Sequence, residues 1–412
     1  MQTTIPLLTG QILFLAALGL AGLVLARVSK LDAALSCALL GLIGGQALPF
    51  LGIDTGIRAS NIHDLVFYVV LPILVFEAAW HLQMSLLKRW LWPILLLATL
   101  GVLLASLVVA VGVFYGINHP GFPFIAALLT GAILSATDPA SVISTLQKLN
   151  APRDLATLME GESLFNDATA VVLFSVVLAI AMGMVDDGTG ESSYLAYFAT
   201  TFFGGLLTGF VAGLLAAIVC LALRDRSAAT LALVILAFAS FYVAEHWLHV
   251  SGILAVMTAA ITSKMLLREH EAVLLKDVQP TWAWLGKFFN TIVFVLLGLV
   301  MQFSMFSHQW LAILIAIAAT LLARFATIYA AGFATRGNTY PIPAGWLLVM
   351  SWGGVRGIIA VVLALSLPVE LPYWWTIQSM VFGVVVFSML VQAPTAGWFI
   401  RRYANRELHD GH

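Results

Sequence analysis

The stretch Gly161-Glu162-Ser163-Leu164-Phe165-Asn166-Asp167-Ala168-Thr169-Ala170-Val171-Val172-Leu173-Phe174 decides how the rest of the chain is interpreted. From Ala168 it continues through apolar residues as far as Met184, which predicts a helix that crosses a lipid bilayer. Glu162 and Asp167 therefore lie at or near membrane depth. Because a charge at that depth is costly, an ionisable side chain there indicates a functional site. We predict that Asp167 exchanges a small cation for a proton.

The composition indicates a polytopic membrane protein. Of the 412 residues, 61% are hydrophobic and 9% are charged, and the mean hydropathy is +1.01, whereas soluble domains are about a quarter charged. Cys37 and Cys220 both lie in apolar runs, so we expect neither a disulfide framework nor a metal site built on them. Residues 1–26 lack the basic start of a signal peptide and count as the first span.

The apolar runs predict an all-α polytopic membrane protein with about 13 transmembrane helices. We place the spans near 6–26, 33–51, 61–80, 91–116, 122–147, 154–184, 194–223, 228–248, 250–265, 284–305, 309–334, 342–367 and 373–400. An odd count suits two inverted-topology repeats with broken helices crossing at the midplane. The first half covers about 1–190, a linker helix about 194–223 and the second half about 228–400. Together they form a single transmembrane transporter domain, 1–412, with no soluble C-terminal domain expected.

The basic residues predict the orientation of the chain. All but three of the 19 Lys and Arg residues lie beside connections on one side of the membrane; Arg58 falls on the other side, and Arg324 and Arg356 fall within spans. Because basic residues are enriched in cytoplasmic connections, we expect the N-terminus outside and the C-terminus in the cytoplasm of a multi-pass protein of the cell membrane. The bilayer is the expected surrounding; no nucleic acid or soluble partner is implied.

Helix breakers occur at comparable positions in the two halves. Thr137-Asp138-Pro139 interrupts the fifth span, and Trp352-Gly353-Gly354 with Gly357 interrupts the twelfth. Proline lacks an amide hydrogen and disfavours helix at the preceding residue, so carbonyl groups become free at membrane depth. Free carbonyl, hydroxyl and carboxylate oxygens can replace the water of a hard cation. The alternative for Asp138 is a simple kink in which its side chain bonds to a neighbouring helix.

The neighbours of Asp167 suit one exchanging carboxyl group. Ser163 lies one turn earlier on the same face, and Asn166 is neutral where a second acid could stand. Burial favours a neutral carboxyl group and a bound cation favours an ionised one, so one buried Asp holds either a proton or a metal ion. The alternative is a structural carboxylate paired with a fixed base.

Three further charged residues call for partners or roles. Glu162 precedes Asp167 by five residues and faces elsewhere on the helix; we expect it to pair with Arg324, with Arg356 as the other candidate base. Arg356, beside glycines, could instead bond to freed carbonyl groups. Glu77, at the end of the third span, is either a ligand or gate on the inner route or a hydrated residue at a helix end. Gly205, Gly209 and Gly213 form a stripe that predicts close helix packing.

Four motifs together resemble the NhaP-type sodium/proton antiporters, prokaryotic relatives of the animal sodium/proton exchangers. They are Glu162–Asp167, Thr137-Asp138-Pro139, Phe76-Glu77-Ala78 and Gly353-Gly354-Val355-Arg356-Gly357. The resemblance implies a thirteen-helix inverted-repeat fold, a homodimer, an elevator-like movement and electroneutral exchange, in keeping with Asn before Asp. It implies no cofactor, because Na⁺ or Li⁺ and H⁺ are the transported ions.

Residue by residue, the resemblance makes Asp167 the acid that binds cation and proton. It makes Asp138, the Thr137 carbonyl and the Ser163 hydroxyl the other Na⁺ ligands. Glu77 is expected to guard or complete this ion- and proton-binding site from the cytoplasmic side. Site support is expected from Asn166, Glu162, Arg324 and Arg356, with Glu162 pairing with Arg324 and touching Asn166.

The expected function is therefore secondary active Na⁺ (or Li⁺)/H⁺ antiport and not enzymatic catalysis. K⁺/H⁺ exchange stays open, because ligand type alone does not determine ion size. A cation channel or a membrane sensor is the alternative from another class, distinguished by conduction without proton coupling or by an output domain. An organic-anion symporter is less compatible with the chain, because four intramembrane acids outnumber two bases.

Overall fold

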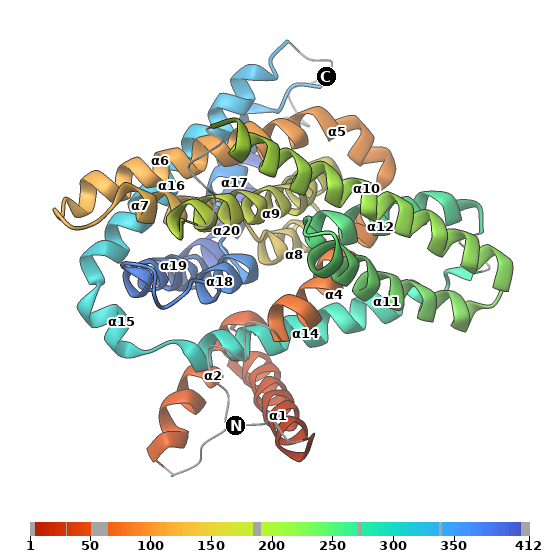
Figure 1. Cartoon of the computed structure of the whole chain (residues 1–412), viewed down its shortest axis with the longest axis horizontal. Helices are drawn as coiled ribbons and strands as arrows, with labels where there is room; N and C mark the ends of the chain where they lie inside the picture. The colour runs from red at the N-terminus through yellow and green to blue at the C-terminus, as the bar shows by residue number, and fades with distance from the viewer. Residues whose placement is uncertain are drawn as a thin grey trace.

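The computed structural model describes residues 5–29, 31–50, 65–183, 191–270, 274–337 and 340–404. Every regular element in these ranges is a helix (Figure 1). The first half contains α1 (Ile5–Ser29), α2 (Ala33–Phe50), a π turn Val66–Val70 leading into α4 (Leu71–His81), α5 (Met84–Leu96), a π turn Leu97–Gly101, α6 (Val102–Ile117), α7 (Phe124–Ser135), α8 (Ala140–Lys148) and α9 (Arg153–Ala181). α10 (Glu191–Leu223) follows.

The second half continues in the same manner. It contains α11 (Arg226–Tyr242) with a π turn Val243–Trp247, α12 (Gly252–Leu267), a 3-10 turn Arg268–His270, α14 (Val278–Val300), α15 (Phe303–His308), α16 (Trp310–Ala334), α17 (Ala344–Trp352), α18 (Ile358–Leu365), α19 (Trp374–Phe387), a π turn Ser388–Gln392, α20 (Ala393–Phe399) and a π turn Ile400–Ala404. Helices suit this sequence because a spanning segment must satisfy its own backbone hydrogen bonds in lipid.

The expectation of an all-α polytopic membrane protein is confirmed. Over the described ranges, nine helical runs are long and apolar enough to cross a membrane. Residues 33–47 and 66–81 form shorter apolar helices. The ninth and twelfth predicted spans coincide with α12 and with the pair α17 and α18. Each predicted span thus falls on a helix or a pair of helices, although the described part of the third span starts only at residue 65.

The helices form two groups that pack extensively within themselves. One group, the panel bundle, contains α1, α2, α4, α10, α11, α12 and α14; α10 packs on α12, and α2 packs on α14. The other, the broken-helix bundle, contains α5 to α9 and α16 to α20; α6 packs on α7 and α16, and α9 packs on α5 and α7. In Figure 1, α1, α2 and α14 lie at the bottom of the view and α11 and α12 lie towards the right, whereas α10 runs from the right across the upper middle. Contacts between the bundles are sparse and include α9 against α4 and α10.

The glycine stripe of the seventh span packs within the chain, as its spacing predicted. A Cβ atom added to Gly205, Gly209 or Gly213 would lie 2.2–2.7 Å from backbone oxygens of Ser251, Ala255 or Ala259. α10 and α12 therefore approach each other backbone to backbone. These glycines face α12 and are not available for a contact between subunits.

Candidate ion-binding site

Two interrupted helices cross in the broken-helix bundle. α7 ends at Ser135 before Pro139, and α17 ends at Trp352 before the run of glycines. The non-helical segment between α7 and α8 lies against the one between α17 and α18. The Asp138 N–H of the first donates to the Val355 carbonyl of the second across 2.7 Å. The two sequence breaks therefore form a single structural feature.

The charges of Asp138 and Arg356 compensate the partial charges at the ends of the four half-helices. The Asp138 carboxylate lies at the starts of α8 and α18: it accepts the Ala140 N–H at 3.1 Å and sits where a side chain on Gly357 would clash. Arg356 donates from Nε to the Leu134 carbonyl at the end of α7, across 2.6 Å, and from Nη1 to Gly354. An anion at helix starts and a cation at helix ends both oppose the helix dipoles.

Glu162 forms its ion pair with Arg324 and not with Arg356. The two Arg324 Nη atoms each lie 2.8 Å from one Glu162 oxygen, so the pair is bidentate. Both side chains are buried, and Arg324 also donates from Nε to the Met350 carbonyl at 3.2 Å. Charges that are paired and fully hydrogen-bonded are tolerated in an apolar interior.

Asn166 connects this ion pair to the first helix break. Its amide nitrogen donates to Glu162 Oε1 and to Thr137 Oγ1, both at 2.9 Å. Its amide oxygen accepts the Thr137 N–H at 3.3 Å. The Ser163 hydroxyl donates to the Thr137 carbonyl. Asn166 therefore uses its donor and its acceptor groups to hold Thr137 in place, while the carboxyl of Asp167 remains beside it.

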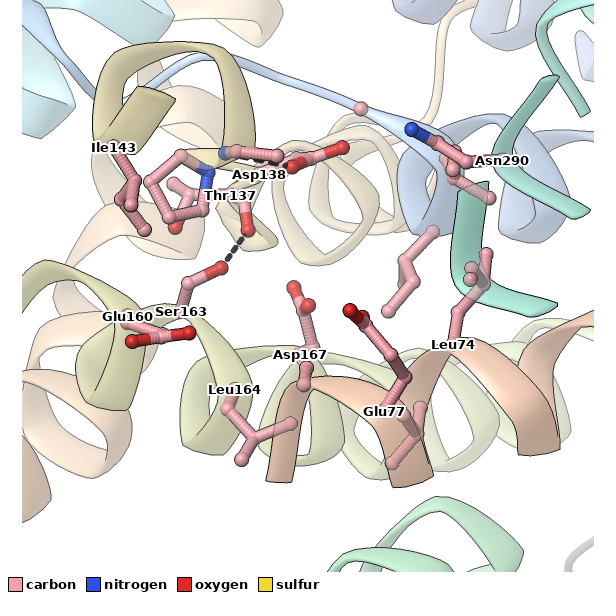
Figure 2. Close-up of a pocket in the computed structure, with 18 of the residues that line it drawn as sticks. Leu74, Glu77, Thr137, Asp138, Ile143, Glu160, Ser163, Leu164, Asp167 and Asn290 are labelled. Atoms are coloured by element: carbon pink, nitrogen blue, oxygen red, sulfur yellow. Dashed lines mark hydrogen bonds between the residues drawn. The ribbon is translucent and has the colours of Figure 1, made fainter. Parts of the chain in front are cut away.

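Asp167 differs from these satisfied groups. Its Oδ1 atom is buried and has no hydrogen-bond partner among the residues that the structure describes, although unpaired buried polar atoms are costly and rare. The side chain lines a cavity of about 500 Å³ together with Asp138, Thr137 and Ser163. Figure 2 shows the Asp167 carboxyl group pointing from α9 towards the Thr137–Asp138 break. Asp167 therefore presents a carboxyl group with one unpaired oxygen to the cavity.

Glu77 reaches the same cavity from the other bundle. It lies on α4, and Figure 2 shows its carboxyl group on the side of the cavity next to Asp167. His81 Nδ1 lies 3.3 Å from Glu77 Oε1. Gly286 on α14 leaves room for the Glu77 carboxyl group, since a Cβ atom there would come within 2.9 Å of it. The cavity is thus lined from both bundles.

Some polar residues of the cavity were not expected from the sequence, among them an acid and an amide. Glu160 and Asn290 also line the cavity, from α9 and α14. Glu160 precedes Asp167 by seven residues, which is about two helical turns, so its spacing carried a detectable signal. Asn290 stood out only as an amide in an apolar run.

The donor groups suit a mixed coordination shell. Among the described residues, no group of three or more Asp, Glu, His or Cys side chains lies close enough to hold a metal ion. The carboxylates of Asp138 and Asp167 are accompanied instead by the Ser163 hydroxyl and the Thr137 carbonyl. Hard cations accept such mixtures of oxygen ligands.

A membrane protein in which two broken helices cross beside buried charged groups has the architecture of a secondary transporter. Residues 5–402 match the family described as "Sodium/hydrogen exchanger, transmembrane". The chain belongs to this family, and its relatives place it among the NhaP-type sodium/proton antiporters.

Two sequence relatives and one solved structure illustrate the similarity. The Na(+)/H(+) antiporter ApNhaP of Aphanothece halophytica is 33% identical over 395 residues, which is 93% of this chain and 73% of the relative. The Na(+)/H(+) antiporter NhaP of Pseudomonas aeruginosa is 33% identical over 366 residues, 85% of this chain and 84% of the relative. The sodium proton antiporter MjNhaP1 from Methanocaldococcus jannaschii, at pH 8, has the same fold, with a TM-score of 0.80 at 22% identity over 97% of this chain and all of that one.

Proposed function

We propose that this protein is a secondary active antiporter that exchanges Na⁺ (or Li⁺) for H⁺ by competition at Asp167. The observation that carries the proposal is the buried Asp167 Oδ1 atom, which has no hydrogen-bond partner in the described part of the chain and lies at the cavity beside a helix break. Relatives at 33% identity bear the name Na⁺/H⁺ antiporter, which supports the choice of ions.

In the proposed cycle, Asp167 releases its proton to the side that the cavity faces. A partly dehydrated cation then binds to Asp167, Asp138, the Thr137 carbonyl and the Ser163 hydroxyl. Because the cation stabilises the ionised carboxyl group and burial stabilises the protonated one, the two ions exclude each other. Asn166 is neutral and bonded to Thr137 and Glu162, so a single titrating group per crossing supports electroneutral exchange.

Alternating access is proposed to occur by an elevator-like movement of the broken-helix bundle against the panel bundle. The sparse contacts between the bundles support this movement. In the proposed scheme of thirteen spans, each inverted half gives its first three spans to the panel bundle and its last three to the broken-helix bundle, and the linker span α10 joins the panel bundle. The resemblance further supports a homodimer in the cell membrane, and the Lys and Arg distribution supports an outer N-terminus and a cytoplasmic C-terminus.

K⁺/H⁺ exchange is the second candidate, because carboxylate, hydroxyl and carbonyl oxygens bind either ion. A proton-flux assay separates the candidates. Full-length protein in proteoliposomes with a preset pH gradient receives Na⁺, Li⁺ and K⁺ in turn. We expect Na⁺ and Li⁺ to dissipate the gradient. A response to K⁺ alone would identify K⁺ as the exchanged cation in place of Na⁺. Conduction of any cation without proton movement would favour a channel. No response to any of the three cations would contradict antiport.

A further inference from the structure

We propose that Glu160 is an access carboxylate of the ion pathway, which attracts the cation at the mouth of the cavity and passes it to Asp167. The proposal rests on the antiport proposed above and adds a residue to its pathway. Four acids line the cavity of about 500 Å³, and Glu160 is the one among them to which the proposed antiport cycle assigns no role.

The spacing of Glu160 places it in line with Asp167. Seven residues correspond to about two turns of a helix, so both side chains project from the same face of α9. Ser163 and Leu164, which lie one turn from each acid, line the cavity as well. Figure 2 shows Glu160, Ser163 and Asp167 following one another along α9. A cation that leaves Glu160 therefore meets the Ser163 hydroxyl before it reaches Asp167.

Glu160 lies towards the mouth of the cavity. The exposed members of the lining lie on α8 and α14: they are Ala140, Ser144 and Gln147 on α8, and Ala283 and Lys287 on α14. The buried members include Thr137 and Ser163, which lie at the helix break. Glu160 is half-buried and comes before Ser163 in α9, two turns away from Asp167. It is therefore positioned between the exposed rim and the exchanging acid.

The Glu160 carboxyl group is free to receive an ion. Within the described residues it has no hydrogen bond and no ion pair, in contrast to Glu162, which is fully bonded. The charges of Glu77, His81 and Lys264 act on the Glu160 carboxyl group electrostatically, without a direct hydrogen bond. Lys264 donates its ammonium hydrogens to the carbonyls of Trp80 and Leu82 at the end of α4. Asp167 Oδ1, which is buried in the same cavity, also has no hydrogen-bond partner within the described ranges, so the cavity holds an unpaired oxygen that a ligand could satisfy.

A partly exposed carboxylate suits this task energetically. A pathway must bind an ion well enough to admit it but weakly enough to release it, which favours several weak positions over one strong one. Like-charged groups in a cleft with apolar walls concentrate counter-ions, and such focusing raises association rates by about 10–10³-fold. Losing one of the four acids should therefore raise the apparent KM for the cation and leave the rate at saturation nearly unchanged.

The test is a set of initial-rate measurements in proteoliposomes over a range of Na⁺ concentrations. For Glu160→Gln we expect an apparent KM about three- to tenfold above that of the unaltered protein, with the maximal rate within about twofold. Glu160→Asp retains the charge and should stay close to the unaltered protein. Glu269→Gln is the matched control, because it removes the same charge from an exposed position outside the cavity. Added choline chloride should narrow the difference in KM, because salt screens the attraction.

A second experiment varies the charge at position 160 by chemical labelling, so that the two charge states are compared in the same folded variant. Glu160→Cys, in a background in which the buried Cys37 and Cys220 are replaced by Ala, is modified with a negatively charged or a neutral thiol reagent of similar size. The negatively charged label should give the lower KM. Equal KM values for the two labels, or a Glu160→Gln variant whose maximal rate falls while its KM stays unchanged, would overturn the proposal and leave antiport intact. An unaltered protein that exchanges none of Na⁺, Li⁺ and K⁺ would overturn both.

Discussion

At position 167 a carboxyl group and an amide have nearly the same shape, so Asp167→Asn removes the charge and the exchangeable proton while keeping the packing. We expect this variant to lose exchange with every cation. Asp167→Glu should retain part of the activity, since it keeps the acid but displaces it by a methylene group. Proton flux in proteoliposomes measures both effects. Asp277→Asn, at an exposed position before α14, is the control for loss of one negative charge.

Binding provides a second measurement at the same residue. A ligand that binds only the folded protein stabilises it, so Na⁺ should raise the thermal midpoint of the unaltered protein in a concentration-dependent manner. Asp167→Asn should show no such increase. Full exchange activity in Asp167→Asn, or an unchanged response of its thermal midpoint to Na⁺, would contradict the assignment of Asp167 as the ion-binding acid.

The pair Glu162–Arg324 is expected to contribute to folding and not to ion selectivity. Because both side chains are buried, removing one leaves an uncompensated charge at a cost of about 3–5 kcal/mol. Glu162→Gln and Arg324→Leu should therefore lower the yield of folded protein and its thermal midpoint. Exchanging the two residues should restore part of both. Normal yield and stability in the two single variants would show that the pair is dispensable.

Individual residues of the site differed in how far the sequence could predict them. Asp138, Glu162 and Asp167 stand out because ionisable groups are rare in apolar runs. The partner of Arg356 could not be chosen, because the carbonyls of Leu134 and Gly354 become available only where two distant breaks meet. Glu160 is less distinctive in the sequence, because it lies near the start of the span, where acids are common, although its spacing from Asp167 is helical.

Among the elements, the two helix breaks depend on a close approach that only glycine permits. A Cβ atom on Gly357 would lie 2.2–2.6 Å from atoms of the Asp138 side chain. Gly357→Ala should therefore displace Asp138 and lower the exchange rate by about a hundredfold, since small misplacements of reacting groups have effects of that order. Gly101→Ala is the matched control, because the nearest atom there is 3.6 Å away. Normal exchange by Gly357→Ala would show that Asp138 tolerates displacement.

The elements themselves were largely predictable, because length and apolarity identify a spanning helix and Pro139 identifies a break. The meeting of the two breaks was not predictable from local signals, since the hydrogen bond from Asp138 to Val355 joins residues more than two hundred positions apart. The π turns, such as Val66–Val70 and Leu97–Gly101, also carry no distinctive composition. Both features are set by packing between helices and not by the propensity of one segment.

At the scale of the whole molecule, the cavity lies between the two bundles. Glu77 and Asn290 line it from the panel bundle, whereas Asp138, Glu160 and Asp167 line it from the broken-helix bundle. Any movement of one bundle along the other changes the distance between these two sets of groups. The acids proposed to carry the ion would travel together, because α8 and α9 belong to the same bundle, while Glu77 would stay behind on α4.

Joining the bundles should therefore stop transport. Ser144 on α8 and Asn290 on α14 line the cavity from opposite bundles. In a background with Cys37 and Cys220 replaced by Ala, cysteines at both positions are linked with a bifunctional thiol reagent that contains a disulfide. We expect proton flux to fall to background after linking and to recover when the reagent is cleaved by reduction.

Two controls separate restraint from obstruction of the cavity. A monofunctional reagent of similar size on the same two cysteines tests whether the added bulk alone blocks the ion. The second control places cysteines at Ala283 and Lys287, which are both exposed on α14 and both line the cavity. These positions are four residues apart on one face of the helix, so a link between them does not connect the two bundles. Transport that survives the link between α8 and α14 would mean that the bundles do not move relative to each other at this place. The ion would then have to reach both sides of the membrane through rearrangement of the half-helices themselves.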